Sequence, residues 1–157
     1  METQSIAAIK KELTHISEPE LLAICLRLIK FKKANKELAH YLLFEAQDEN
    51  AYVAKINALI KERFNETPTH SAYFAMKHIR KTLKLVNQYS AYSDLVQTEI
   101  DLLLFFLEEL KPFKKYYPHQ LVLSNLWDRQ LVKLHKLVAK LHEDLQYDYE
   151  RRMDFEL

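Results

Sequence analysis

The sequence predicts an all-α protein of six or seven antiparallel helices in hairpins, packed as a compact bundle or as a short α-solenoid-like stack. Three observations predict this class. The 157 residues include no glycine, whereas average usage of about 7% would give roughly eleven. Apolar residues recur at helical spacing in most segments, and strand-like alternation is nowhere sustained. Tight β-hairpin turns also depend on glycine.

Length and composition bound the function. A chain of this length fits a single domain, 1–157, that buries roughly 68–70% of its unfolded surface. Without glycine the chain contains no Rossmann, P-loop or kinase phosphate loop and no Gly-x-Ser-x-Gly elbow. The N-terminal residues lack a signal-peptide core, and no apolar run approaches the length of a bilayer span. We expect a cytoplasmic protein with no membrane segment and no cofactor.

The first secure helix begins at Glu18. Residues Ser17–Glu20 have the Ser-x-x-Glu form of a capping box. From Leu21 to Ile29 only Arg27 is charged, which predicts a helix buried on several sides. Cys25 lies inside this run and is predicted to be a reduced core residue.

Further helices follow with short connections. The first should end near Lys33, with Asn35 as a left-handed cap in place of glycine. We then expect helices over 36–46, 49–64 and 71–89, with the clearest loop at 65–71. Ser93 and Asp94 can cap the next helix, which is apolar almost all round, should be central, and should stop before Pro112.

No strong breaker occurs between residues 118 and 152. Apolar residues in this segment alternate steps of four and three, as in a heptad seam. They are Leu123, Trp127, Leu131, Leu134, Val138, Leu141 and Leu145. The pattern predicts one long C-terminal helix that spans the domain.

The segment from Ile9 to Leu43 reads IKKELTHISEPELLAICLRLIKFKKANKELAHYLL. It resembles the start of small uncharacterised all-helical bacterial proteins of unknown function. The resemblance covers roughly the first third of the chain. It implies an all-helical fold, and it implies no activity or site.

Two Glu-x-x-His pairs, Glu12 with His15 and Glu37 with His40, have the spacing found in carboxylate-bridged dimetal bundles. Such bundles also need a glutamate from each of two further helices. The central part of the helix between the two pairs has no carboxylate. We therefore interpret both pairs as ordinary helix residues and predict no metal site and no catalytic residue.

The charge order is more informative than the net charge of +1. Residues 67–93 contain four basic residues and no acid, whereas 94–109 contain five acids and no basic residue. Residues 111–142 are again basic, and 143–157 are acidic. Two basic segments therefore flank an acidic helix.

Each basic segment places its cations at one-face helical spacing. The stripes are Lys77, Arg80, Lys81 and Lys84, and Arg129, Lys133, Lys136 and Lys140. One interpretation is that they bind a nucleic-acid backbone, with Tyr116 and Tyr117 stacking on bases. The other is that they are solvated faces or pair with the acidic helix.

The C-terminal residues Tyr147, Tyr149 and Phe155 lie among acids and suggest either a docking segment for another chain or a frayed helix end. Together these patterns predict a non-catalytic interaction protein. It binds another protein through helix faces or its C-terminal helix, and nucleic-acid binding through the basic stripes is the alternative.

Overall fold

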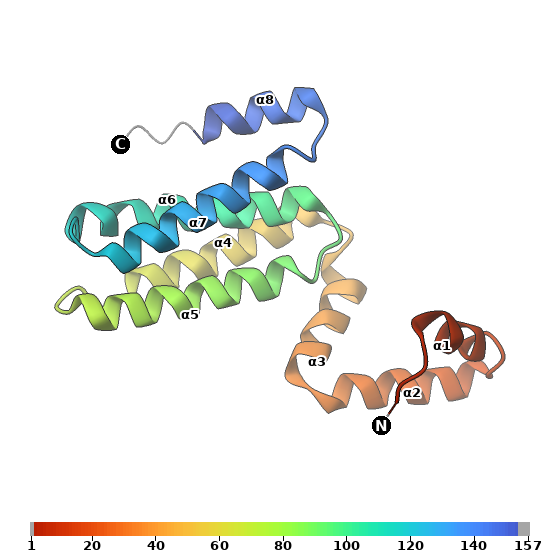
Figure 1. Cartoon of the computed structure of the whole chain (residues 1–157). Helices are drawn as coiled ribbons and strands as arrows, with labels where there is room; N and C mark the ends of the chain where they lie inside the picture. The colour runs from red at the N-terminus through yellow and green to blue at the C-terminus, as the bar shows by residue number, and fades with distance from the viewer. Residues whose placement is uncertain (1, 154–157) are drawn as a thin grey trace. The chain divides into compact units, whose positions relative to one another are not determined.

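The computed structural model describes residues 2–153, which form eight α-helices and no strand. The helices are α1 Ile6–Leu13, α2 Glu18–Phe31, α3 Lys33–His40, α4 Glu49–Asn65, α5 Ala72–Ser90, α6 Val96–Tyr116, α7 Leu121–Val138 and α8 Glu143–Arg152, with a π-helical segment η1 at Tyr41–Glu45 (Figure 1). The all-α class is confirmed, with eight helices rather than six or seven. The contacts divide the chain into an N-terminal unit, 1–44, and a C-terminal unit, 45–157. The prediction of a single domain stays a prediction.

Helix α6 is the centre of the C-terminal unit. It contacts α4, α5 and α7, and it runs antiparallel to α5 and α7 (Figure 1). Seven of its apolar side chains are at most 1% exposed: Ile100, Leu102, Leu103, Leu104, Phe106, Leu107 and Leu110. A helix that is apolar on every side needs neighbours on every side. The predicted central position of this helix is confirmed.

The predicted end of α6 before Pro112 is wrong, because the helix continues to Tyr116. A proline inside a helix removes one backbone hydrogen bond and strains the preceding turn. The aromatic contacts on both sides of it favour continuation. Phe113 lies 5.7 Å from Phe64, ring centre to ring centre, and Phe64 also contacts Phe106 at 5.4 Å.

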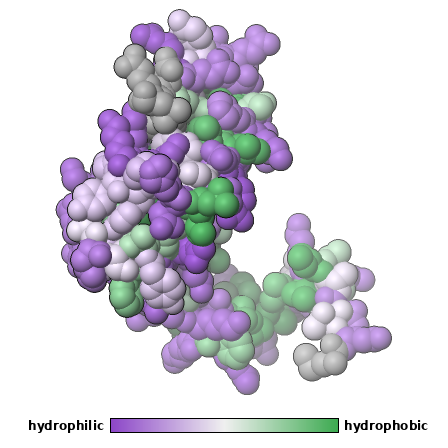
Figure 2. Space-filling view, turned by 60° about the vertical axis from the view of Figure 1, so that its left-hand side comes forward, coloured by the Kyte–Doolittle hydropathy of each residue, from purple (hydrophilic) through white to green (hydrophobic). Residues whose placement is uncertain are grey.

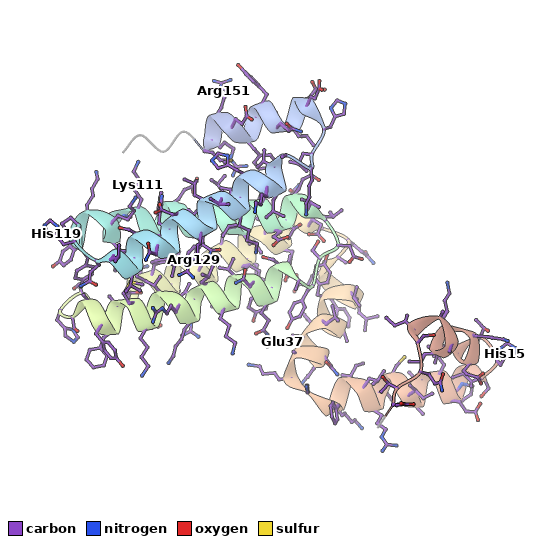
Figure 3. All side chains as sticks on the ribbon, viewed as in Figure 1. His15, Glu37, Lys111, His119, Arg129 and Arg151 are labelled. Atoms are coloured by element: carbon purple, nitrogen blue, oxygen red, sulfur yellow. The ribbon has the colours of Figure 1, made fainter. Side chains whose placement is uncertain are left out.

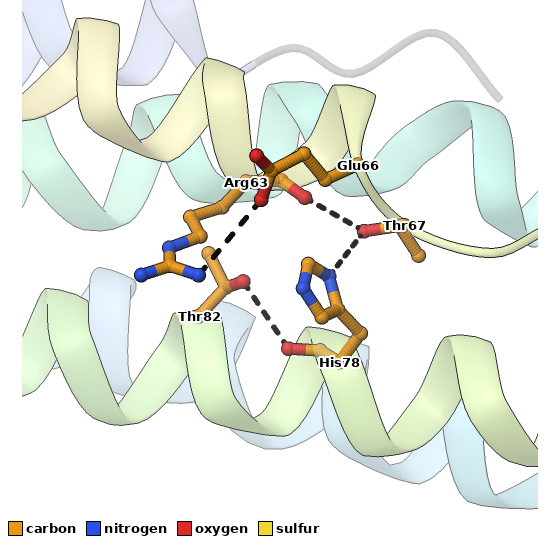
Figure 4. A network of polar contacts seen from close by, with 5 residues as sticks. All are labelled: Arg63, Glu66, Thr67, His78 and Thr82. Atoms are coloured by element: carbon orange, nitrogen blue, oxygen red, sulfur yellow. Dashed lines mark hydrogen bonds and ion pairs between the residues drawn. The ribbon is translucent and has the colours of Figure 1, made fainter.

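Polar contacts fix both ends of the C-terminal unit. At one end the Glu49 carboxylate accepts hydrogen bonds from Thr98 Oγ1 at 2.6 Å and Ser93 Oγ at 3.2 Å. At the other, in the turn between α4 and α5, buried Thr67 contacts His78 Nδ1 at 2.9 Å and donates to the Arg63 carbonyl (Figure 4). These contacts set the positions of the loops that join α4, α5 and α6.

The predicted long C-terminal helix is wrong. The chain leaves the helix after Val138 and starts α8 at Glu143. His142 caps α8, since its Nδ1 accepts from the Asp144 backbone N–H at 3.4 Å. The short helix α8 packs on α7 and brings Tyr149 to the side of α6. No glycine or proline marks this break, so tertiary contact decides it.

Helix ends in this chain do not use left-handed residues. None of the residues from 2 to 153 has a positive φ, and the cap residues Glu66, Ala91 and Ala139 keep right-handed backbone angles. The predicted left-handed cap at Asn35 is wrong. Asn35 lies inside α3, and its Nδ2 donates to the Leu28 carbonyl at 2.7 Å.

The N-terminal unit contains α1, α2 and α3. The capping box at the start of α2 is confirmed, since Glu20 accepts from the Ser17 backbone N–H at 3.1 Å. The predicted burial of 21–29 is wrong, because α2 has no buried residue and Cys25 is exposed. Hydrophobic side chains lie on the surface of this unit (Figure 2). Its three helices are too few to surround α2 as the larger unit surrounds α6.

We expect Leu103→Ala in α6 to lower the free energy of unfolding by about 2–5 kcal/mol, because it removes a fully buried side chain and leaves a cavity. Urea unfolding followed by circular dichroism measures this. Val132→Ala is the control, since Val132 is 52% exposed, and its effect should be within about 0.5 kcal/mol. Equal effects of the two changes would contradict the central position of α6.

Candidate binding face of helices α5 and α7

The basic stripe on α5 is an unpaired, exposed surface. Lys77, Arg80, Lys81 and Lys84 are all exposed, on the side of α5 opposite the buried Ile79. Within residues 2–153, none of the four takes part in an ion pair. Four uncompensated cations on one helix face create a region of positive potential.

The stripe on α7 is partly used inside the protein. Lys133 forms an ion pair with Glu99 of α6 at 2.7 Å and donates to Asn87 Oδ1 of α5 at 3.1 Å. Arg129, labelled in Figure 3, is exposed and donates through Nε to the Asn125 carbonyl at 3.0 Å. Lys136 and Lys140 are exposed. The predicted place of Lys140 on this helix face is wrong, because α7 ends at Val138. On the helix itself the stripe leaves Arg129 and Lys136 at the surface, and Lys133 connects helices.

The structure brings α5 and α7, which carry the two stripes, into contact at two places. Helices α5 and α7 run in the same direction (Figure 1). Met76 of α5 and Val122 of α7 line one groove, and one helical stretch further along, Asn87 of α5 bonds Lys133 of α7. Met76 and Asn87 are eleven residues apart on α5, and Val122 and Lys133 are eleven residues apart on α7. Equal separations are what two parallel neighbouring helices require. That register places Arg129 level with Leu83, one residue before Lys84.

A groove of about 370 Å³ lies where α5 and α7 begin. Its lining residues are Ala72, Tyr73, Met76, Lys77, Arg80, Gln120 and Val122. Tyr73 is 72% exposed and Leu121, beside the groove in sequence, is 71% exposed. The groove thus combines an apolar floor, an aromatic rim and two cations. We call this groove with the α5 stripe and Arg129 the basic face.

The aromatic part of the basic face was not predicted. Phe74 is 50% exposed and contacts Tyr73 edge-on at 5.4 Å. Both residues lie in the first turn of α5, off the face that carries the buried Ala75 and Met76. Assigning each residue of α5 to a helix face would have predicted that Tyr73 and Phe74 lie off the buried face.

The acids of α6 hold the following helices in place. Glu99 pairs with Lys133, as described above, and Asp101 pairs with Arg152 of α8 at 2.9 Å. Asp101 also accepts a hydrogen bond from the Tyr149 hydroxyl at 3.2 Å. The interpretation that the basic stripes pair with the acidic helix therefore holds for Lys133 and not for the α5 stripe.

The proposed C-terminal docking residues differ in their surroundings. Tyr147 is 63% exposed, with the Arg151 guanidinium 5.9 Å from its ring centre. Tyr149 is buried, and burial together with the neighbouring Asp101 carboxylate raises the pKa of its phenol to about 12. Tyr149 is already bonded to Asp101 of α6 and is not presented to another chain. Phe155 lies outside the described residues.

The two tyrosines predicted to stack on bases also differ. Tyr117 donates through its hydroxyl to the Thr69 carbonyl at 2.5 Å and so connects two loops. Tyr116 is 64% exposed and lies edge-on to Tyr117 at 5.2 Å. Beside them, Lys114 Nζ lies 4.4 Å from the Trp127 ring centre. Tyr116 alone of this pair presents its ring to solvent.

The Glu-x-x-His pairs have local contacts. His15 Nδ1 bonds the Lys11 carbonyl at 2.8 Å, and Glu37 forms an ion pair with Lys33 at 3.5 Å. His15 and Glu37 lie on different segments of the N-terminal unit (Figure 3). Among residues 2–153, no three His, Cys, Asp or Glu side chains come together in a way that could hold a metal ion.

No family model, curated protein or solved structure matches this chain. The resemblance of the first third to small bacterial helical proteins stays a prediction. Over residues 2–153, every helix is too short or too polar to cross a bilayer.

We expect the free energy of unfolding to fall as the pH rises from 10 towards 12. Over that range Tyr149 ionises near its ordinary pKa of about 10 in the unfolded chain but stays protonated in the folded protein. Tyr149→Phe should lower stability at neutral pH by about 1–2 kcal/mol, since it removes the hydrogen bond to Asp101. It should also reduce the loss above pH 10.

Urea unfolding at neutral and alkaline pH measures both effects. Tyr147→Phe is the matched control, because its exposed hydroxyl has no such environment. Identical alkaline behaviour of the two variants would show that Tyr149 does not have the raised pKa.

Proposed function

We propose that the protein is a non-catalytic interaction protein whose basic face binds an acidic segment of another protein. The observation that carries this proposal is the groove between α5 and α7, where exposed Tyr73 and the apolar Met76 and Val122 lie beside unpaired cations. Aromatic residues, methionine and arginine are enriched in protein interfaces. A partner helix with one acidic and one apolar face matches this surface.

Composition supports a protein partner over a nucleic acid. The net charge is +1 and the isoelectric point about 7.8, whereas dedicated nucleic-acid domains have strongly basic surfaces. Lys133, in the middle of the α7 stripe, is paired with Glu99. A phosphate backbone would also leave the apolar floor of the groove without a partner.

Nucleic-acid binding is the second candidate, and a specific observation favours it. Helices α5 and α7, which carry the two basic stripes, share a groove with exposed Tyr73 at one end. Cations along a groove with an aromatic ring are the surface that single-stranded nucleic acids use. Such binding would weaken steeply with salt, because each neutralised phosphate releases counterions.

The proposal includes no catalytic step, cofactor or membrane contact. It places the protein in the cytoplasm, where an exposed thiol such as Cys25 stays reduced. The cytoplasmic location is an expectation of this proposal. The bacterial origin is an expectation that comes from the resemblance.

We expect the triple variant Lys77→Gln, Lys81→Gln and Lys84→Gln to weaken binding of a labelled amphipathic acidic peptide about tenfold. Three surface charges at up to about 0.5 kcal/mol each account for this loss. Fluorescence anisotropy at low salt measures it. The control changes Lys10, Lys11 and Lys61 to glutamine, which alters net charge equally, and should bind as the wild type does.

A second variant separates the two candidates. Val122→Ser makes the groove floor polar, so it should weaken the peptide severalfold and leave binding of a labelled DNA single strand unchanged. Tight binding of the single strand with a steep salt dependence and no effect of Val122→Ser on either probe would support the nucleic-acid candidate. Equal binding by the triple variant and the wild type would contradict both.

A further inference from the structure

The N-terminal unit presents far more apolar surface than a folded unit of its size can leave in water. Within residues 2–44, Tyr41 alone is buried. Twelve large apolar side chains of this unit are between 38% and 86% exposed: Ile6, Ile9, Leu13, Leu21, Leu22, Ile24, Leu26, Leu28, Phe31, Leu42, Leu43 and Phe44. A contiguous apolar surface of this kind on a protein usually marks a binding site.

The exposed area matches a protein interface. With roughly 150 Å² for a whole side chain of this size, the twelve side chains expose on the order of 1,000 Å². A standard interface buries about 800 Å² on each partner. These side chains lie on α1, α2 and η1, so the α2 face described next accounts for part of this exposed area.

Helix α2 carries a continuous apolar face. Leu21, Leu22, Cys25 and Leu28 follow the three- and four-residue steps that place side chains on one side of a helix. Leu22 and Leu28 are 60% and 57% exposed, and Cys25 is exposed. Cys25 lies at the middle of this face and of the helix, which runs from Glu18 to Phe31.

The charges of α2 are separated along its length. Its first turn contains Glu18 and Glu20. Its other end is basic, with Lys30 in the last turn and then Lys32 and Lys33. Between the two ends the charged residue is Arg27, which is not among the residues of the apolar face.

We propose that the partner of this face is a second copy of the chain, with the two α2 helices packed antiparallel across a twofold axis near Cys25. This arrangement places the acidic end of each helix beside the basic end of the other, twice over. It also aligns the helix dipoles favourably. A parallel pair would place like charges together at both ends. The twofold axis makes the apolar face its own complement.

This proposal is independent of the basic face, which lies in the C-terminal unit. An experiment that contradicts one of these two proposals therefore leaves the other unaffected. Variants of α2 leave Lys77, Arg80 and Val122 unchanged, and variants of the basic face leave α2 unchanged.

We expect the full chain to have twice its 18.7 kDa mass in solution, measured by light scattering after size-exclusion chromatography. Leu22→Glu with Leu28→Glu should give a monomer, because four buried carboxylates would oppose association. The control, Leu95→Glu with Val132→Glu, changes exposed apolar residues of the other unit and should stay a dimer. Circular dichroism checks that both variants keep their helices.

Cys25 reports whether this face of α2 is the interface, and Glu18 reports the orientation. Mild oxidation of the wild type should give a disulfide-linked dimer, and Cys25→Ser should lose the link while keeping the dimeric mass. Glu18→Lys should weaken the dimer about tenfold, since it places like charges opposite each other at two positions. Adding Lys32→Glu should restore it.

Three results would overturn the proposal. A wild-type monomer at all accessible concentrations would do so, because the apolar face would then be covered in another way. A dimer that keeps its mass with Leu22→Glu and Leu28→Glu would place the interface elsewhere. A dimer insensitive to Glu18→Lys would exclude the antiparallel pairing.

Discussion

The structure of the C-terminal unit depends on the burial of α6. A helix with Leu102, Leu103 and Leu104 in sequence is apolar on every side, so no single layer of neighbours can cover it. Helices α4, α5 and α7 surround it. Its few acids, at the edges of this enclosure, become the attachment points for Lys133 and for α8. The positions of α5 and α7 around α6 in turn create the basic face.

Helices α2 and α6 show how far composition predicts structure. Both read as apolar almost all round, and both were predicted to be buried, yet α6 has eight buried residues and α2 has none. An apolar helix sequence indicates that the helix surface must be covered. It does not indicate whether the covering residues come from the same chain. This difference underlies both the wrong prediction for α2 and the inference of a second copy.

The sequence predicts helix ends correctly where interactions between neighbouring residues determine them. The capping box at Ser17 and the helices over 49–64 and 71–89 were predicted to within about one residue at each end. The errors at Pro112 and in the segment from Ala139 to His142 are tertiary. Phe113 packs against the buried Phe64 and favours helix past Pro112, and Asp101 holds α8 through Tyr149. The spacing predicts the α5 cations, but their position beside a groove shared with α7 required the fold.

The absence of glycine and of positive φ angles has a consequence for the unfolded state. A chain without glycine explores fewer backbone conformations when unfolded, and each glycine replaced by another residue at a compatible position adds about 0.4–1 kcal/mol to stability. Every turn in residues 2–153 uses backbone angles that any L-residue can adopt. Part of what keeps these helices folded is therefore the stiffness of the chain that they fold from.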